Sequence, residues 1–145
     1  MNSIQELVNY LDNKGCRLRG CTSKEIAKIE TFFGVELPLA YRDFLYLMGK
    51  GAGDFMKGSS VFYNEIFDLR EGSSRLLEED EFKPLPENTF VFWMHQGYQF
   101  AFFYLNEGDD PPVYFYYEGR GYEDFEKKEK SFTIFLEKQL ALSGL

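Results

Sequence analysis

The sequence predicts an α+β domain: helices at the N-terminus, then a central, mostly antiparallel sheet of about four to six strands, then a C-terminal helix. Three observations carry this prediction. Apolar residues recur at helical spacing in the first part of the chain, short apolar runs between turn residues fill the middle, and helical spacing returns at the end. Helices and strands that are segregated along a chain are typical of α+β folds.

Length and composition fit one folded unit. The chain has 145 residues, so we expect a single domain with one core over residues 1–145. Hydrophobic residues make up 44% and aromatic residues 19%, which is too apolar for a disordered chain. The formal net charge is −8, from 16 basic and 24 acidic residues. Such a surface repels nucleic acid and anionic membranes, and it attracts basic partners.

The chain shows no targeting signal. Its start has neither a basic leader nor an apolar run before a small-residue cleavage site, and no stretch approaches the roughly 18 apolar residues of a spanning helix. We therefore expect a soluble cytoplasmic protein. Cys16 and Cys21 are too few for a structural zinc site, and we expect two reduced thiols, with a local disulfide as the alternative.

Two capping boxes introduce the first helices. Ser3 with Glu6, and later Thr22 with Glu25, each precede an apolar stripe at helical spacing. Gly34 follows the second stripe, where a left-handed C-cap is expected. The stripes are Ile4, Leu7, Val8 and Leu11 in the first helix and Ile26, Ile29, Phe32 and Phe33 in the second.

A third helix is expected after Pro38, which suits the first helical position because its missing N–H would have no intrahelical partner there. Its apolar stripe is Tyr41, Phe44, Leu45 and Met48. A glycine-rich segment at 49–53 then ends the helix. The stretch FFGVELPLAYRDFL is thus a helix stop, a corner and a helix start. We expect the corner to be packed from inside by Phe33, Tyr41, Phe44 and Leu45.

The run EIAKIETFFGVELPLAYRDFLYLMGKGAG resembles the N-terminal signature of the SUKH superfamily. This group of small domains includes fungal regulators of cell-wall glucan synthesis and many bacterial immunity proteins. The shared features are a helix containing Glu30, its terminal glycine, a Leu-Pro pair, an aromatic residue, a Phe-Leu pair and a glycine-rich close. The motif residues here are Gly34, Leu37, Pro38, Tyr41, Phe44 and Leu45. Many members close with Asn-Gly-Gly, whereas this chain has Gly-Lys-Gly-Ala-Gly at 49–53.

The second half of the chain contains the strands. VFYNEIFDL, at 61–69, predicts one or two brief strands, and SSRLLEEDEF, at 73–82, predicts a short capped helix. TFVFWMHQGYQFAFFYL predicts a hairpin that turns near Gln96 and Gly97. VYFYY predicts a third strand, and residues 122–125 a fourth. SFTIFLEKQLAL then predicts a helix capped by Ser131, with a stripe of Phe132, Phe135, Leu136 and Leu140.

The resemblance continues in this half, through the Leu-Pro pair at 85–86, Gly97, the Pro-Val-Tyr strand at 112–114 and the Ser-Phe start of the last helix. The predicted hairpin is apolar on both parities, since Phe90, Phe92 and Met94 alternate with Val91, Trp93 and His95. Two interpretations fit. Either loops and helices cover both faces of the sheet, or one aromatic face is partly exposed to a partner. We favour the covered sheet.

No catalytic or metal-binding pattern stands out. His95 is the only histidine and has no accompanying nucleophile motif, so we interpret it as a partly buried or turn-capping residue. The acidic runs at 78–81 and 107–110 lack calcium-loop spacing and are expected to be solvated. The glycines at 49–58 do not match a phosphate-binding loop. We therefore expect no enzyme activity, no cofactor and no metal.

The resemblance implies a protein that binds another protein. Bacterial members are mostly regarded as immunity proteins, which neutralise a cognate toxin domain, often a nuclease. A toxin with a basic surface suits an acidic chain that offers aromatic anchors beside charge. The candidate partner-binding residues are Glu78, Glu79, Asp80, Glu107, Asp109, Asp110, Tyr114, Tyr116 and Tyr117. A regulatory scaffold like the fungal members is the second hypothesis, and an unfamiliar carboxylate enzyme the third. The sequence predicts no oligomeric state.

Overall fold

The computed structural model describes residues 4–119, 121 and 123–145. The helices in these residues are α1 (Ile4–Asn13), α2 (Ser23–Phe33), α3 (Leu39–Met48), α4 (Tyr63–Glu79) and α5 (Phe132–Ser143). The strands are β1 (Leu18–Arg19), β2 (Gly51–Ala52), β3 (Ser59–Ser60), β4 (Thr89–His95), β5 (Gln99–Tyr104), β6 (Val113–Tyr117) and β7 (Glu126–Glu129).

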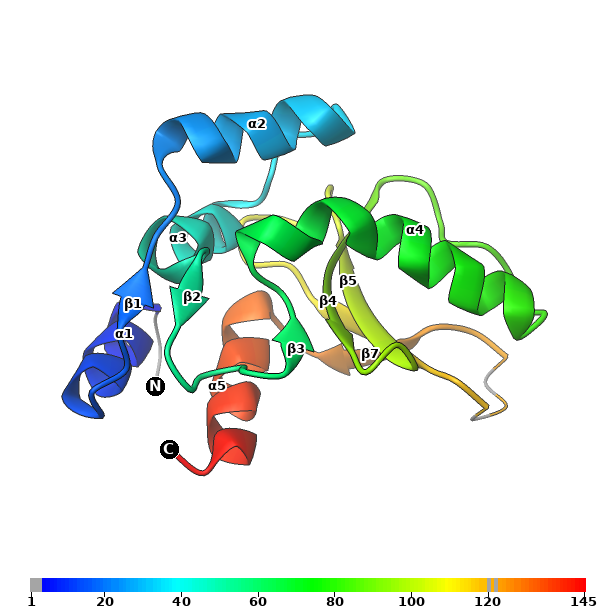
Figure 1. Cartoon of the computed structure of the whole chain (residues 1–145). Helices are drawn as coiled ribbons and strands as arrows, with labels where there is room; N and C mark the ends of the chain where they lie inside the picture. Colours follow the sequence, from blue (N-terminus) through cyan, green and yellow to red (C-terminus); the bar gives the residue numbers. More distant parts are fainter. Residues whose placement is uncertain (1–3, 120, 122) are drawn as a thin grey trace.

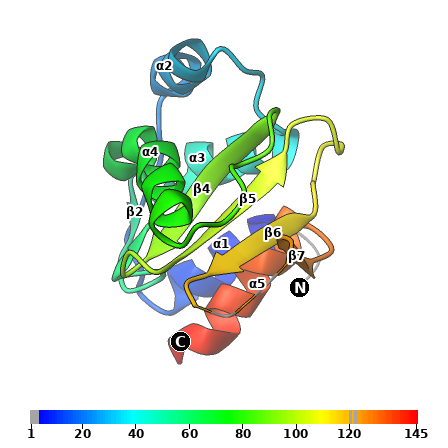
Figure 2. The same ribbon diagram turned by 90° about the vertical axis from the view of Figure 1, so that its right-hand side faces the viewer.

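The strands form two antiparallel sheets. The larger sheet has five strands in the order β3-β4-β5-β6-β7, and β1 pairs with β2 in the smaller one. Helix α4 lies along one face of the larger sheet, while α3 and α5 lie on the opposite face (Figures 1 and 2). The architecture confirms the predicted α+β class and the predicted antiparallel sheet.

The helix-start and helix-stop signals act largely as predicted. Thr22 and Glu25 form a reciprocal capping box at the start of α2, and Gly34 ends this helix with a φ of 65°. Pro38 is the N-cap of α3, one residue before the position expected for it. Ser131 caps α5, where its Oγ accepts the N–H of Ile134 at 3.1 Å. Ser3, the predicted cap of the first helix, lies outside the described residues.

The corner between α2 and α3 is held by Glu30. Its carboxylate accepts the backbone N–H of Leu37 at 2.8 Å, which links the last turn of α2 to the start of α3. The backbone carbonyl of Glu30 also accepts the N–H of Val35 at 3.0 Å. The packing residues Tyr41, Phe44 and Leu45 are fully buried beneath this corner, and Phe33 is half-buried. The motif residues thus build a rigid helix–corner–helix unit.

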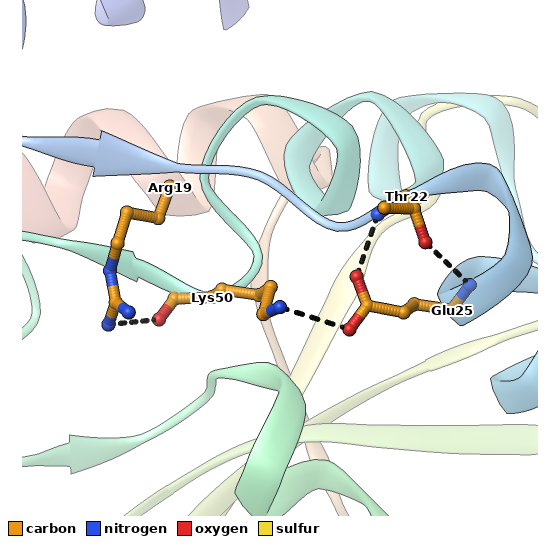
Figure 3. Close-up of polar contacts among 4 residues, drawn as sticks. All are labelled: Arg19, Thr22, Glu25 and Lys50. Atoms are coloured by element: carbon orange, nitrogen blue, oxygen red, sulfur yellow. Dashed lines mark hydrogen bonds and ion pairs between the residues drawn. The ribbon is translucent and has the colours of Figure 1, made fainter.

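A second link ties the start of α2 to the segment after α3 (Figure 3). Glu25 forms an ion pair with Lys50 at 3.1 Å while also accepting the N–H of Thr22 at 2.9 Å. The Lys50 carbonyl in turn accepts a hydrogen bond from Arg19 at 2.9 Å. The Thr22 N–H and Lys50 together lower the pKa of the Glu25 carboxyl. Part of the glycine-rich segment at 49–53 is a strand rather than a loop, because residues 51–52 pair with β1.

The predicted strands at 61–69 are wrong. The chain is helical from Tyr63 to Glu79, and the helix predicted at 73–82 is the second half of this one element, α4. Its buried residues recur at helical spacing, and the one at the centre is a serine. They are Ile66, Leu69, Ser73, Leu76 and Leu77. Gly72 lies against the sheet, where a Cβ would be 3.7 Å from the Cε of Met94, an ordinary van der Waals distance, so the packing does not require glycine. Packing in the core here outweighs the low helix propensity of Gly72 and Ser73.

The fourth strand was also misplaced. Strand β7 covers Glu126–Glu129 rather than 122–125, and Tyr122 lies outside the described residues. Phe125 instead packs its ring 5.2 Å from Phe82 and 5.1 Å from Phe102. The sequence of β7 is EKKE, and such charge is typical of an edge strand that must not pair with other chains. This strand has no alternation of apolar and polar residues from which it could be predicted.

Both faces of the predicted hairpin are covered, and the hairpin turns at Gln96 and Gly97 as expected. Strand β4 carries a bulge between Val91 and Trp93, which makes Phe92 an extra residue opposite β5. Phe92 and Trp93 consequently face the same way, and their rings lie 5.1 and 5.8 Å from Phe135 of α5. The simple alternation expected for this strand is therefore broken at its centre.

Two further expectations concern thiols and membranes. Cys16 and Cys21 are both free and buried, as expected for reduced thiols. Burial raises the pKa of the Cys21 thiol to about 11, and the nearby charge of Glu25 adds to this effect.

Within the described ranges, no helix is both long enough and apolar enough to cross a membrane.

Candidate protein-binding surface

A row of aromatic rings crosses the α4 side of β5 and β6. Neighbouring ring centroids along this row are 4.8 to 5.5 Å apart, a spacing at which rings attract one another. In order, the rings are Tyr116, Phe82, Phe125, Phe102, Tyr114 and Tyr104. The register places Phe102 opposite Tyr114, so the strand pairing itself aligns the row.

Asp80 stands at one end of the row. It ends α4 and accepts hydrogen bonds from the Tyr116 hydroxyl and, at 3.3 Å, from the backbone N–H of Gly119. Burial raises the pKa of the Tyr116 phenol strongly, and the hydrogen bond to Asp80 raises it further. The phenol is thus a fixed donor to a carboxylate that remains partly accessible.

Glu107 stands at the other end, beside two half-buried tyrosines. The pKa of Tyr114 is raised by burial and then by the charge and hydrogen bond of Glu107. The pKa of Tyr104 is raised by burial and then by the charges of Asp124 and Glu107. Both phenols are therefore neutral rings with polar tips next to negative charge, a combination suited to a basic partner.

Lys83 lies between the two ends of the row. Lys83 forms an ion pair with Asp124 and lies 5.4 Å over the ring of Phe125. The hydrogen bond from Lys83, followed by the backbone N–H of Phe125, lowers the pKa of Asp124. We call the accessible part of this region the tyrosine–acid surface, defined by Asp80, Tyr104, Glu107, Tyr114 and Asp124.

The structure brings together only some of the predicted residues. Glu78 and Glu79 are exposed on the last turn of α4, directly before Asp80. Tyr116 is only 3% exposed, so its ring belongs to the core and only its hydroxyl reaches Asp80. Tyr117 lies on the other face of the sheet, with its ring 6.0 Å from that of Phe115. A role of these four residues, Glu78, Glu79, Tyr116 and Tyr117, in binding a partner stays a prediction.

Asp109 and Asp110 serve the opposite layer. A side-chain oxygen of Asp110 accepts the N–H of Thr133 at 3.0 Å in the first turn of α5. The backbone carbonyl of Asp109 accepts the N–H of Ala40 at 2.8 Å, which anchors the loop to α3. Both side chains remain exposed, but their loop is held against helices rather than beside Asp80.

Sequence reasoning missed three members of the region, namely Tyr104, Asp124 and Lys83. Tyr104 shares its strand parity with Phe102, and that alternation was the available signal. The stripe predicted for α2 included Phe32, but this residue is 62% exposed, with its ring 5.1 Å from that of Phe67 in α4. No local pattern separates this exposed ring from the stripe of α2.

A cavity of about 420 Å³ lies beside the start of β4. Arg70 lines it and donates to the Thr89 carbonyl at 2.8 Å, the Thr89 hydroxyl at 3.1 Å and the Pro86 carbonyl at 3.4 Å. Burial lowers the pKa of this guanidinium. Because its donors already serve the chain, Arg70 clamps α4 to the start of β4 rather than offering a ligand site.

His95 is half-buried at the end of β4, and its Nδ1 lies 3.1 Å from the Ser59 hydroxyl. Across residues 4–119, 121 and 123–145, no group of three or more His, Cys, Asp or Glu side chains is arranged to hold a metal ion. The region with the features of a binding site is thus the tyrosine–acid surface, where aromatic rings adjoin charge.

Comparison with known proteins agrees with the resemblance seen in the sequence. The model of the SMI1 / KNR4 family (SUKH-1) matches residues 20–138, from just before the Thr22 capping box into α5. No curated protein matches the chain. Because the match spans most of the sequence and includes the helix–corner–helix unit, the five-stranded sheet and the first part of α5, the chain belongs to the SMI1 / KNR4 family (SUKH-1).

Proposed function

We propose that this protein is a non-enzymatic binding module that neutralises a cognate toxin domain, such as a nuclease, by occluding it. The observation that carries the proposal is the tyrosine–acid surface, where half-buried tyrosines lie between the carboxylates of Asp80 and Glu107. Family membership supports an immunity-type or regulatory role. Neutralisation by occlusion requires binding alone, so no catalytic group is needed.

Charge supports the choice of a basic partner. A chain with a net charge of −8 is steered toward a positive surface, and association becomes faster at low salt. A nuclease carries such a surface where it holds phosphates. A stable complex buries roughly 1,600 Å², and aromatic anchors near the centre with charge around them supply most of its binding energy. Tyr104 and Tyr114 are the proposed anchors.

A regulatory scaffold is the second candidate, since the same family match supports it. Such a protein binds signalling or wall-synthesis proteins and rescues no cell from a toxin. The two candidates therefore differ in one readout, the survival of cells that also make the toxin.

The test is co-expression with the product of the adjacent gene. Rescue of a lethal phenotype and purification of a one-to-one complex are expected. A binding-site variant, Asp80→Asn with Glu107→Gln and Asp124→Asn, is compared with a control, Asp12→Asn with Glu36→Gln and Glu71→Gln, whose carboxylates are exposed elsewhere. Both variants change the net charge equally, and the amides at 80 and 124 keep an acceptor oxygen for Tyr116 and Lys83. Urea denaturation of both variants checks that a difference in binding is not a difference in stability.

We expect the binding-site variant to weaken the complex and to flatten its salt dependence, while the control leaves both nearly unchanged. Equal effects of the two variants would exclude the tyrosine–acid surface as the contact. A complex without rescue would favour the scaffold, and the absence of both would reject this neighbour as the partner.

A further inference from the structure

A second candidate site lies on the opposite face of the sheet. A cleft of about 440 Å³ opens between the C-terminal half of α5, the loop before β3 and the ends of strands β4 to β7. We call it the tryptophan cleft. Its buried wall is formed by Trp93, Gln99 and Phe115, and exposed lysines at its rim are Lys57, Lys128 and Lys138.

Two irregularities of the sheet meet at this cleft. The bulge in β4 turns Trp93 toward α5, as its ring contact with Phe135 shows. A second bulge lies where β6 pairs with β7, and there Lys128 is the extra residue, between Lys127 and Glu129. Bulges re-aim side chains and occur preferentially near functional sites. In this sheet both bulges contribute a side chain to one cleft.

The cleft wall also contains unused hydrogen-bonding capacity. Trp93 is 4% exposed, and its indole N–H has no hydrogen-bond partner among the residues described. Gln99 is 8% exposed; its side-chain amide bonds to none of the described residues, and the polar atoms of this amide remain accessible to solvent. Buried polar groups are normally paired, so the unpaired indole N–H, in the same wall as an amide that is free to bond a ligand, points to a bound polar ligand.

The charge of the rim indicates the sign of that ligand. Lys128 and Lys138 form no ion pair within the described part of the chain, whereas Lys57 lies 3.9 Å from Asp54. With Glu129, the lining holds three lysines against two carboxylates. This local excess of positive charge lies in a chain whose net charge is −8. The cleft therefore favours a small anion, while the rest of the molecule repels a polyanion.

We propose that the tryptophan cleft binds a carboxylate carried on an aromatic body, either a free small acid or the C-terminal residue of a peptide. The ring would lie against Trp93 and Phe115, and the carboxylate would accept from Gln99 and face Lys128 and Lys138. The proposal is independent of toxin binding, because the cleft and the tyrosine–acid surface lie on opposite faces of the sheet.

Trp93 makes the test direct, because it is the only tryptophan and its fluorescence reports on the cleft. The full chain is titrated with 3-phenylpropionate and, as an uncharged control, with 3-phenylpropanamide. A tripeptide ending in phenylalanine is tested in the same way, with a free or an amidated terminus. We expect saturable fluorescence changes with a carboxylate and several-fold weaker binding of the matched amide.

Variants locate the binding. Removing the charges at Lys128 and Lys138 together, as Lys128→Ala with Lys138→Ala, should weaken carboxylate binding about fivefold. The control, Lys14→Ala with Lys24→Ala, removes the same charge from exposed positions outside the cleft and should change little. Gln99→Leu should weaken binding and leave the Tm nearly unchanged, since the amide that it removes bonds to no described residue.

The outcomes are distinct. Binding of the free acid but not of the tripeptide identifies a small acid as the ligand type, and the reverse identifies a peptide terminus. Equal affinity for acid and amide, equal effects of the two lysine variants, or no binding of any carboxylate would overturn the proposal. None of these results depends on whether a toxin partner is found.

Discussion

The hydroxyl of Tyr116 on β6 donates a hydrogen bond to the carboxylate of Asp80, the residue that ends α4. The bond joins the end of the long helix to a strand 36 residues further along the chain. It therefore fixes one end of the tyrosine–acid surface to the core, which makes that surface rigid before any partner arrives.

Tyr116→Phe should reduce the free energy of unfolding by about 1 kcal/mol, because it removes the hydrogen bond from the phenol to the Asp80 carboxylate. Urea denaturation at neutral pH measures the change, and Tyr98→Phe in the exposed hairpin turn is the matched control. A loss no larger than that of the control would show that the bond contributes nothing to stability.

The same phenol predicts a pH effect. Its folded pKa is raised above the ordinary value of about 10 by burial and by Asp80. Its contribution to stability is therefore complete below about pH 10 and is lost as the pH rises further, because the unfolded phenol ionises first. Stability measured from pH 8 to 11 should fall less steeply in Tyr116→Phe than in the parent. Parallel curves would contradict the assignment.

Cys21 should react slowly with alkylating reagents. Burial and the charge of Glu25 raise its pKa to about 11, so almost no thiolate is present at pH 8. Peptide mapping by mass spectrometry after iodoacetamide treatment should find Cys21 protected in the folded protein and modified in urea. Modification at the same rate in both conditions would mean that the thiol is accessible.

Glu30→Ala should lower the free energy of unfolding by about 1–2 kcal/mol, because the Leu37 N–H loses its carboxylate acceptor at the corner. Glu30→Gln, which keeps an acceptor oxygen, should cost less than Glu30→Ala. Thermal and urea denaturation measure both, with Glu36→Ala at an exposed neighbouring position as the control. A ranking in which Gln is as costly as Ala would assign the role to charge instead.

Gly34→Val should cost about 1 kcal/mol or more of folding free energy, because a β-branched residue is strained at a φ of 65°. Sterics elsewhere do not contribute, since a Cβ at this position would meet no atom within 4 Å. Gly34→Asn should cost less, because asparagine tolerates the left-handed region. Partner binding by the folded fraction should be unchanged in both variants, and loss of binding with full stability would place the site at this corner.

The first three helices could be predicted because each carries local chemistry at its ends, such as the Thr22–Glu25 capping box and the left-handed Gly34. Helix α4 could not, because Gly72 and Ser73 interrupt its apolar pattern, and the helix continues through them only because the apolar residues on either side pack in the core. Strand β7 was misplaced for the related reason that a charged edge strand has no apolar face.

The sequence predicted the types of residue that form the candidate site, but not which of the named residues lie together. Local sequence indicated tyrosines and carboxylates, and the structure does group Asp80, Glu107 and Tyr114 along one row of rings. It separates Asp110 and Tyr117 from them, since Asp110 accepts the N–H of Thr133 in the first turn of α5 and Tyr117 lies on the other face of the sheet. Which face a strand residue occupies depends on register, and register is set by partners that are distant in sequence.

The extra residue in β4 has a consequence for how this protein should be mutated. Because Phe92 has no partner in β5, its deletion alone would let the strand pair without a bulge, with Val91 still opposite Phe102 and Trp93 still opposite Ala101. The indole would therefore stay on the α5 side, and the core would lose only the ring that packs on Phe132 and Phe135. Deletion of a paired residue such as Val91 would instead force the strand to shift its register or absorb the bulge.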